Sequence, residues 1–311
     1  MSRESEKALR NLMEYVSQNV SDDPDDSEVE RLVREYMGQQ QSFLDEDEAS
    51  APGADDYLEL AEKAGTDKKK LEYLKTALKL EPDNLDAARM LARVQNKTKS
   101  EYLDALSALI EKAEKALEEE GYFRESMGEF WLILETRPYM RLRNEHMRVL
   151  IECGKMRAAA AECRRMLELC ENDNLGVRFD LIHIYAYLEE EEAAKKLVDQ
   201  CQYSDSSMMV LPMALLYYKL NKPEKAVEYL KILLENNKDT KKFFTAVKTG
   251  RVESYIREIS PYGYRPYTMD ELLTTIAENY YLYEHTTDFF SWANGKLTEI
   301  TPKKANRKGK K

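Results

Sequence analysis

The sequence contains one pair of residues that could form a cysteine–histidine nucleophile, His146 and Cys153, seven positions apart. In enzymes of that kind, the histidine takes the proton of the thiol and the thiolate attacks the substrate. Cys153 directly precedes Gly154, which favours a turn between two helices and therefore an ordinary packing or surface position. We predict that the protein is not an enzyme, and we assign no catalytic residue.

Other patterns that carry chemistry are absent from the sequence. It has no GxxxxGK[ST] or GxGxxG phosphate-binding loop, no HExxH zinc motif and no GxSxG nucleophile turn. A zinc site needs closely spaced ligands, whereas the cysteines include no CxxC pair and the histidines are scattered. We therefore expect no cofactor and no metal. The cysteines fit small apolar residues in a reducing compartment: Cys153, Cys163, Cys170 and Cys201.

Charge is distributed unevenly along the chain, whose net charge is −11. Residues 1–60 hold 17 acidic and 5 basic side chains, whereas residues 301–311 hold 6 basic side chains and no acidic one. A basic tail can contact nucleic acid, but a solvated chain end is the simpler interpretation. We do not expect a nucleic-acid partner, because an acidic chain is repelled by a phosphate backbone except at that tail.

The composition favours helices over strands. Only 11 Gly and 9 Pro occur among 311 residues, and Glu, Lys, Leu and Ala are abundant. No apolar run approaches membrane-spanning length, and the first residues lack the apolar core of a signal peptide. The sequence thus predicts an all-α protein that is cytoplasmic and has no membrane partner.

Residues 1–41 are predicted to form an acidic, amphipathic helical arm. Its first helix repeats apolar residues at helical spacing, namely Leu9, Leu12, Met13 and Val16. The segment SDDPDDSE would end that helix and start a second one. An acidic linker rich in small residues is expected at 42–54.

From residue 55 to residue 235 the chain repeats a pattern. Each clear copy has a small residue and an apolar residue four positions later, and the copies led by Ser126 and Ala159 then reach a Pro or Asn-Asp stop, at Pro138 and at 171–174. The leading positions are Ser126, Ala159, Ala194 and Ala226, in steps of 33, 35 and 32 residues. A small side chain lets two antiparallel helices approach closely. One such pair cannot bury its own apolar faces, so neighbouring pairs must stack.

This pattern resembles the tetratricopeptide repeat, most specifically in the three copies after Met140. The resemblance implies an α-α superhelix of four to five helix pairs. The segment at 137–178 looks more narrowly like a largely uncharacterised group of bacterial tetratricopeptide proteins, and more weakly like the suppression-of-tumorigenicity-seven family. Neither likeness implies a reaction.

The final part of the chain, 236–300, is rich in aromatic residues. A repeat array needs a terminal element that covers its last apolar face, and a helix near 269–283 would supply it. We therefore predict an aromatic C-terminal cap at 236–300, followed by a basic tail at 301–311. An aromatic binding pocket is the alternative interpretation of this segment.

The tetratricopeptide resemblance also implies which residues line the concave groove, because the first helix of each pair faces it. The best-placed partner contacts are Arg141, Asn144, Arg148, Phe179, His183, Tyr187 and Tyr218. A basic end followed by aromatic positions suits an extended or helical peptide with an acidic group and then hydrophobic residues. The alternative for each side chain is a solvated face or a contact with the next repeat. His183 alone fits a packed histidine better than a ligand-binding one.

The predicted function is therefore protein–protein scaffolding, in which a partner protein or peptide binds in the groove. The alternative is a regulatory sensor whose groove binds a short signalling peptide. A further hypothesis concerns the acidic arm, which could fold into the basic end of the groove as an internal ligand at high effective concentration. The oligomeric state is not predicted.

Overall fold

A computed structural model describes residues 3–21, 24–43, 52–202, 204–252, 255 and 263–300. Within these ranges every regular element is a helix, as the sequence predicts, and the β-type contact between Glu129 and Cys170 is an isolated bridge. Most of the predicted linker (44–51) and all of the basic tail (301–311) lie outside the described residues. In the described part of the chain, no helix is both long and apolar enough to cross a bilayer.

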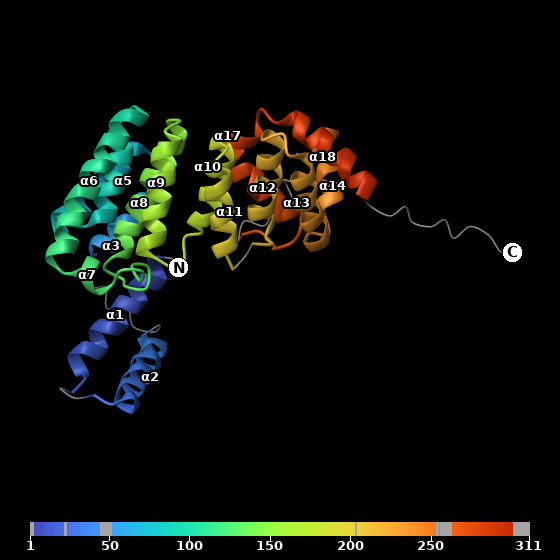
Figure 1. Cartoon of the computed structure of the whole chain (residues 1–311). Coiled ribbons are helices and arrows are strands. Elements are labelled where there is room, and N and C mark those ends of the chain that lie inside the picture. The colour runs from blue at the N-terminus through green and yellow to red at the C-terminus, as the bar shows by residue number, and fades with distance from the viewer. Residues whose placement is uncertain are drawn as a thin grey trace. The chain divides into compact units, whose positions relative to one another are not determined.

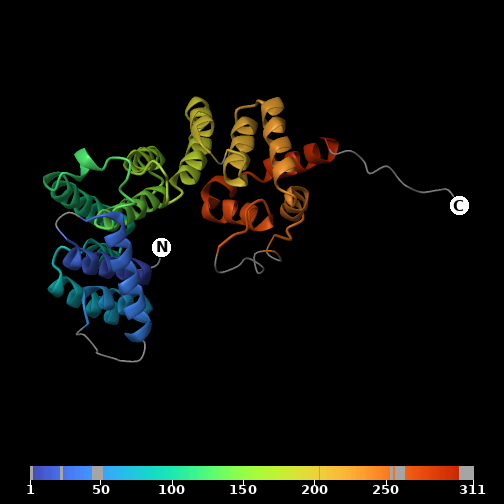
Figure 2. The same cartoon turned by 90° about the horizontal axis from the view of Figure 1, so that it is seen from below.

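The chain divides into two compact units. Unit 1 comprises Met1–Cys153 with Leu169–Asn172, and unit 2 comprises Gly154–Glu168 with Asp173–Lys311. Each unit is a stack of helices with its own core (Figures 1 and 2).

Unit 1 begins with two helices that lie side by side (Figure 1), α1 and α2, joined by ring contact between Tyr15 and Tyr36 at 5.3 Å. The following helices pack in sequence, α3 on α4 and α4 on α5, while α6 and α5 both pack on α8. The helices of unit 1 are α1 (Arg3–Asn19), α2 (Asp26–Phe43), α3 (Ala54–Lys63), α4 (Asp67–Leu80), α5 (Leu85–Gln95), α6 (Lys99–Glu119), α7 (Tyr122–Glu125) and α8 (Arg137–Glu152).

Side-chain caps define where the helices of unit 1 begin. The Asn84 side chain accepts a hydrogen bond from the Ala87 amide at 2.9 Å and starts α5. Thr98 and Glu101 form a reciprocal capping box at the start of α6. Alanines are fully buried where α3, α4 and α5 meet, so the small side chains let these helices approach closely: Ala61, Ala77 and Ala87.

The repeat copy led by Ser126 does not form a helix. Residues 126–136 make turns instead, and Gly128 within them adopts a left-handed backbone angle (φ +91°) that a helix does not contain. The Thr136 hydroxyl donates to the carbonyls of Phe130 and Ile133 and holds the turns in place. Local hydrogen bonding of this kind competes with a helix, which the spacing of apolar residues alone does not reveal.

The leading alanines of the other three copies, Ala159, Ala194 and Ala226, lie in unit 2 and are all fully buried, whereas α8, the first helix of the Ala159 copy, belongs to unit 1. Helix α12 packs on α13, and α10 packs on α11 and α12. The helices of unit 2 are α9 (Met156–Leu169), α10 (Val177–Leu188), α11 (Glu191–Gln200), α12 (Ser207–Lys219), α13 (Pro223–Asn236), α14 (Thr240–Lys248), α16 (Met269–Glu278), α17 (Tyr280–Tyr283) and α18 (Thr287–Ile300).

The aromatic segment of unit 2 packs on the preceding helices. Helix α16 contacts α12 and α14, α17 contacts α10, and α18 contacts α13 and α14 (Figure 2). Four phenylalanines form the centre of this contact, each with at most 4% of its surface exposed: Phe243, Phe244, Phe289 and Phe290. Their neighbouring ring centroids lie 5.3 to 6.3 Å apart, within the range of favourable aromatic contacts.

Candidate functional site

Arg141, on α8, is held between two carboxylates from other helices of unit 1. Its Nη1 donates to Glu6 Oε2 of α1 at 2.9 Å, and its Nε donates to Asp86 of α5 at 3.1 Å. Burial alone would lower the pKa of the Arg141 guanidinium, but the hydrogen bonds to Asp86 and Glu6 raise it. Arg141 therefore stays charged and ties α1 and α5 to α8.

The pairing continues on both sides of Arg141 as a row of alternating charges, which we call the charge row. Beyond Asp86, Arg89 pairs with both Asp86 (3.2 Å) and Glu145. Beyond Glu6, the carboxylate lies 3.5 Å from Nη1 of Arg137. Glu6, Asp86 and Arg137 are each at least 95% buried, so the row lies in the interior of unit 1. Buried charges of this kind are stable only when each has its partner.

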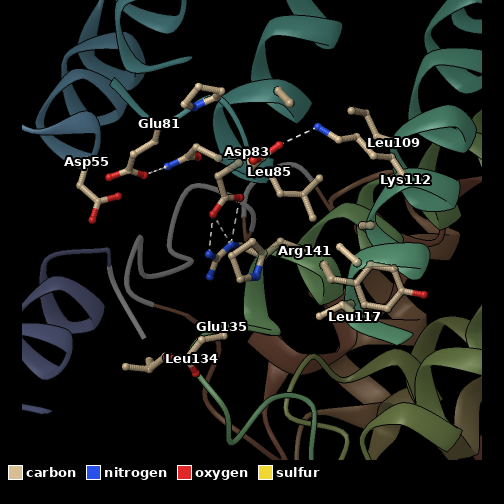
Figure 3. A pocket seen from close by; sticks show the side chains of 18 of the residues that line it. Asp55, Glu81, Asp83, Leu85, Leu109, Lys112, Leu117, Leu134, Glu135 and Arg141 are labelled. Atoms are coloured by element: carbon tan, nitrogen blue, oxygen red, sulfur yellow. Dashed lines mark hydrogen bonds and ion pairs between the residues drawn. The ribbon is translucent and has the colours of Figure 1, made fainter. Parts of the chain in front are cut away.

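A pocket of about 460 Å³ opens beside the charge row, between α1, the start of α5, α6 and α8 (Figure 3). Its inner walls are aliphatic, formed by Leu85, Leu109, Leu117 and Leu134 with Ala113 and Ala116. Charged side chains stand at its edges, including an ion pair between Lys112 and Asp83 at 2.8 Å. Half of the lining residues are charged, so the pocket has the apolar walls of a ligand pocket but more charge than such pockets usually carry.

Helix α1 supplies one wall of this pocket through Glu6, Lys7 and Arg10. Lys7 Nζ lies 2.6 Å from Asp56, and Arg10 Nη1 lies 2.8 Å from Asp55, both at the start of α3. The hydrogen bond from Lys7 and the one from the Gly53 amide lower the pKa of Asp56. The acidic arm thus lies against the charged edge of the unit-1 pocket.

The predicted contacts of unit 1 differ in their surroundings. Arg141 lines the pocket. Asn144 lies one turn further along α8, and its Oδ1 atom is buried without a hydrogen-bond partner in the part of the chain that the structure describes. Arg148 is exposed to solvent.

The predicted contacts of unit 2 lie against aromatic side chains of the same unit. Tyr218 packs on Phe289 and Trp292, at centroid distances of 5.4 and 5.0 Å. Tyr187, with 43% of its surface exposed, contacts the ring of Tyr281 at 5.8 Å.

His183 and Phe179 complete this set. His183 is fully buried, its ring meets Tyr283 edge to face at 5.7 Å, and its Nδ1 lies 2.6 Å from the Phe179 carbonyl. Phe179 is half-buried. In unit 2, α17 and α18 thus cover side chains that the sequence assigns to a partner.

The sequence signals did not identify several residues of the unit-1 pocket. Arg137 stands four positions before Arg141, one helical turn away, and this spacing is the one local sign of a paired basic site. No local pattern indicates that Glu6 and Asp86 would lie beside these arginines. The aliphatic positions of α6 fall in the stretch between repeat copies, where the repeat pattern gives no register.

The structure contains a serine–histidine contact, between Ser107 Oγ and His146 Nε2 at 3.3 Å. The same hydroxyl lies 2.9 Å from the Leu103 carbonyl, so it has one partner on its own helix and one on α8. This contact joins α6 to α8, which pack together.

No protein-family model matches the sequence, and no curated protein is significantly similar to it. Within the described ranges, no group of three or more His, Cys, Asp or Glu side chains is arranged to hold a metal ion. The unit-1 pocket is therefore the candidate site on which we base a function.

One prediction concerns His183, whose burial lowers its pKa from 6.5 to about 4. Because the folded pKa lies below the unfolded one, the folded state favours the neutral imidazole. This stabilisation is complete above pH 6.5 and is lost as the pH falls to 4, by about 3 kcal/mol in total. Urea unfolding at several pH values should show a steeper loss for the wild type than for His183→Gln. Equal slopes for the two chains would contradict this assignment.

Proposed function

We propose that the protein is a partner-binding helical-repeat protein of the tetratricopeptide type, and that its unit-1 pocket holds a helical segment of another protein. Two features support the repeat assignment. The leading alanines of three copies are fully buried, and the helix pairs α10/α11 and α12/α13 each pack together within unit 2. In such proteins a binding surface is built from side chains of successive helices.

The observation that carries the proposal is the unit-1 pocket itself. Its aliphatic walls can receive a few apolar side chains, and the volume of about 460 Å³ falls in the range of ordinary ligand sites. Buried apolar anchors supply most of the affinity of protein interfaces, while charges at the edge fix orientation. Arg141 lines this pocket, as a partner contact predicted from the sequence would.

Filling the pocket should prevent partner binding. Ala116 of α6 lines the pocket and is exposed, so Ala116→Trp would place an indole in the space without disturbing the core. Ala108 is an exposed alanine of the same helix that does not line the pocket, and Ala108→Trp is its matched control. We expect Ala116→Trp to reduce capture of the main partner from cells by about tenfold or more, and Ala108→Trp to leave it unchanged.

Capture is to be measured by affinity purification and quantitative mass spectrometry, with thermal unfolding as the check that both variants are folded. Equal capture by the two folded variants would contradict the assignment of the pocket. A short copurified peptide in place of a protein would support the regulatory-sensor alternative.

A further inference from the structure

Helix α1 contacts the rest of unit 1 through charges of both signs at fixed spacing. Its first charge in this set, Glu6, is buried against two guanidinium groups of α8, Arg137 at 3.5 Å and Arg141 at 2.9 Å. A carboxylate between two arginines is a strong, charge-assisted contact. Glu6 is therefore the main electrostatic anchor of α1.

The next two charges of α1 are basic and meet acids. Lys7 pairs with Asp56 and Arg10 pairs with Asp55, at the start of α3. Both pairs are accessible to solvent, since the Lys7 and Arg10 side chains are 41% and 48% exposed. Exposed ion pairs contribute little to stability, so they select an orientation more than they hold the helix.

Removal of α1 would leave a surface with a defined charge pattern. Arg141 would retain Asp86, and the buried Arg137 guanidinium would lose the Glu6 carboxylate. At the same time Asp55 would lose its basic partner. A ligand with acidic groups alone would satisfy the arginines but would be repelled by the aspartates of α3. The surface therefore matches a helix that carries both signs.

We infer that α1 occupies this surface as an internal substitute for a partner helix. We further infer that the partner carries an acidic residue followed by basic residues one and four positions later, as Glu6, Lys7 and Arg10 do. Glu6, Lys7 and Arg10 form one wall of the unit-1 pocket, so a partner helix that replaces α1 supplies that wall and can place its apolar side chains in the pocket. The inference rests on the proposed function, since it names the partner class for this site. Glu6 and Arg10 lie four positions apart, one turn of the helix, and Lys7 lies three positions before Arg10, so the three charges lie on neighbouring parts of the α1 surface that meets α3 and α8.

Because α1 is part of the same chain, it competes with any partner at a high effective concentration. Linked segments typically reach about millimolar effective concentration. A partner helix of equal intrinsic affinity, present at micromolar concentration, would therefore bind only when α1 is released. Binding in this protein is then controlled by the charges of the arm.

The test uses the full chain and a synthetic peptide. The probe is a fluorescent peptide with the sequence of residues 3–19, and binding is followed by fluorescence anisotropy. In one chain, the arm charges are reversed by Glu6→Lys, Lys7→Glu and Arg10→Glu, so that the arm repels its own site. We expect this chain to bind the peptide at least about tenfold more tightly than the wild type does.

A charge exchange provides a second test. In a chain that carries Glu6→Lys, Lys7→Glu and Asp55→Lys and keeps Arg10, the arm is repelled from its site at each of these positions. The original probe should bind this chain weakly, and a probe with Glu in place of Arg10 should bind it better. The inference would be overturned if the wild-type and arm-reversed chains bound the probe with affinities within about twofold of each other. Equal binding of original and charge-exchanged probes would overturn it as well.

The test separates this inference from the proposed function. Ala116→Trp could lose partner capture while the arm-reversed chain still fails to bind the probe. The pocket would then remain the partner site, but α1 would not be a substitute for the partner helix. A concentration-dependent dimer of the wild type would show that two chains exchange arms. The surface would then bind a second copy of this chain, and the inference would also be rejected.

Discussion

Replacing Arg141 by methionine should lower the free energy of unfolding of unit 1 by about 3–5 kcal/mol. The substitution keeps much of the side-chain length but removes the guanidinium that Glu6 and Asp86 share. Both carboxylates are at least 95% buried, so neither can replace the lost cation by water at small cost. The loss is to be measured by urea unfolding at pH 7, with far-ultraviolet circular dichroism as the signal.

Arg148→Met is the matched control for this prediction, because Arg148 lies on the same helix and is exposed. We expect it to change the free energy of unfolding by no more than about 0.5 kcal/mol. Similar values for the two variants would show that the charge row does not stabilise unit 1. The control also tests whether the partner contact predicted at Arg148 can be removed without loss of the fold.

Replacing Glu271 by leucine should destabilise unit 2 by about 3 kcal/mol or more. The buried Glu271 carboxylate, on α16, accepts hydrogen bonds from Ser206 Oγ at 2.6 Å and from Ser207 Oγ at 2.8 Å, at the start of α12. It also accepts from the Tyr267 amide at 2.8 Å. Leucine fills the space but leaves the two buried serine hydroxyls without this acceptor, and each such group costs about 1–3 kcal/mol.

The measurement is urea unfolding combined with amide hydrogen exchange. Exchange should accelerate in α16 and in the first turn of α12, where the carboxylate joins the two helices. Glu278→Leu is the control, since Glu278 is exposed on the same helix. Protection of α16 that is equal in the two variants would contradict the role given to Glu271.

The helical fold could be predicted from the sequence because its signals are local. Ala159, Ala194 and Ala226 recur at similar steps of 35 and 32 residues, and a small side chain at this spacing indicates helices that pack closely. All three are fully buried. The prediction of a repeat copy at Ser126 was wrong, because the backbone of Gly128 and the hydrogen bonds of the Thr136 hydroxyl favour turns. Neither effect is visible in the spacing of apolar residues.

The candidate site was less predictable, because it depends on contacts between distant segments. Arg141 could be named from the repeat register, but its partner Glu6 lies 135 positions earlier in the chain. Likewise, the register places His183 and Tyr218 in a groove, yet it does not tell which later helix packs there. In the structure Tyr283 contacts His183, and Phe289 and Trp292 contact Tyr218. Their role in partner binding remains a prediction.

The central claim is that the unit-1 pocket holds a segment of a partner, and photo-cross-linking inside the pocket tests it most directly. A photoreactive phenylalanine analogue placed at Ala116 of the full chain lines the pocket, and the same analogue at Ala108 lies outside it. After irradiation in cells, the account predicts a cross-link from position 116 to one helical segment of a partner, and none from position 108. The same cross-linked proteins from both positions, or a cross-link from 108 alone, would contradict it.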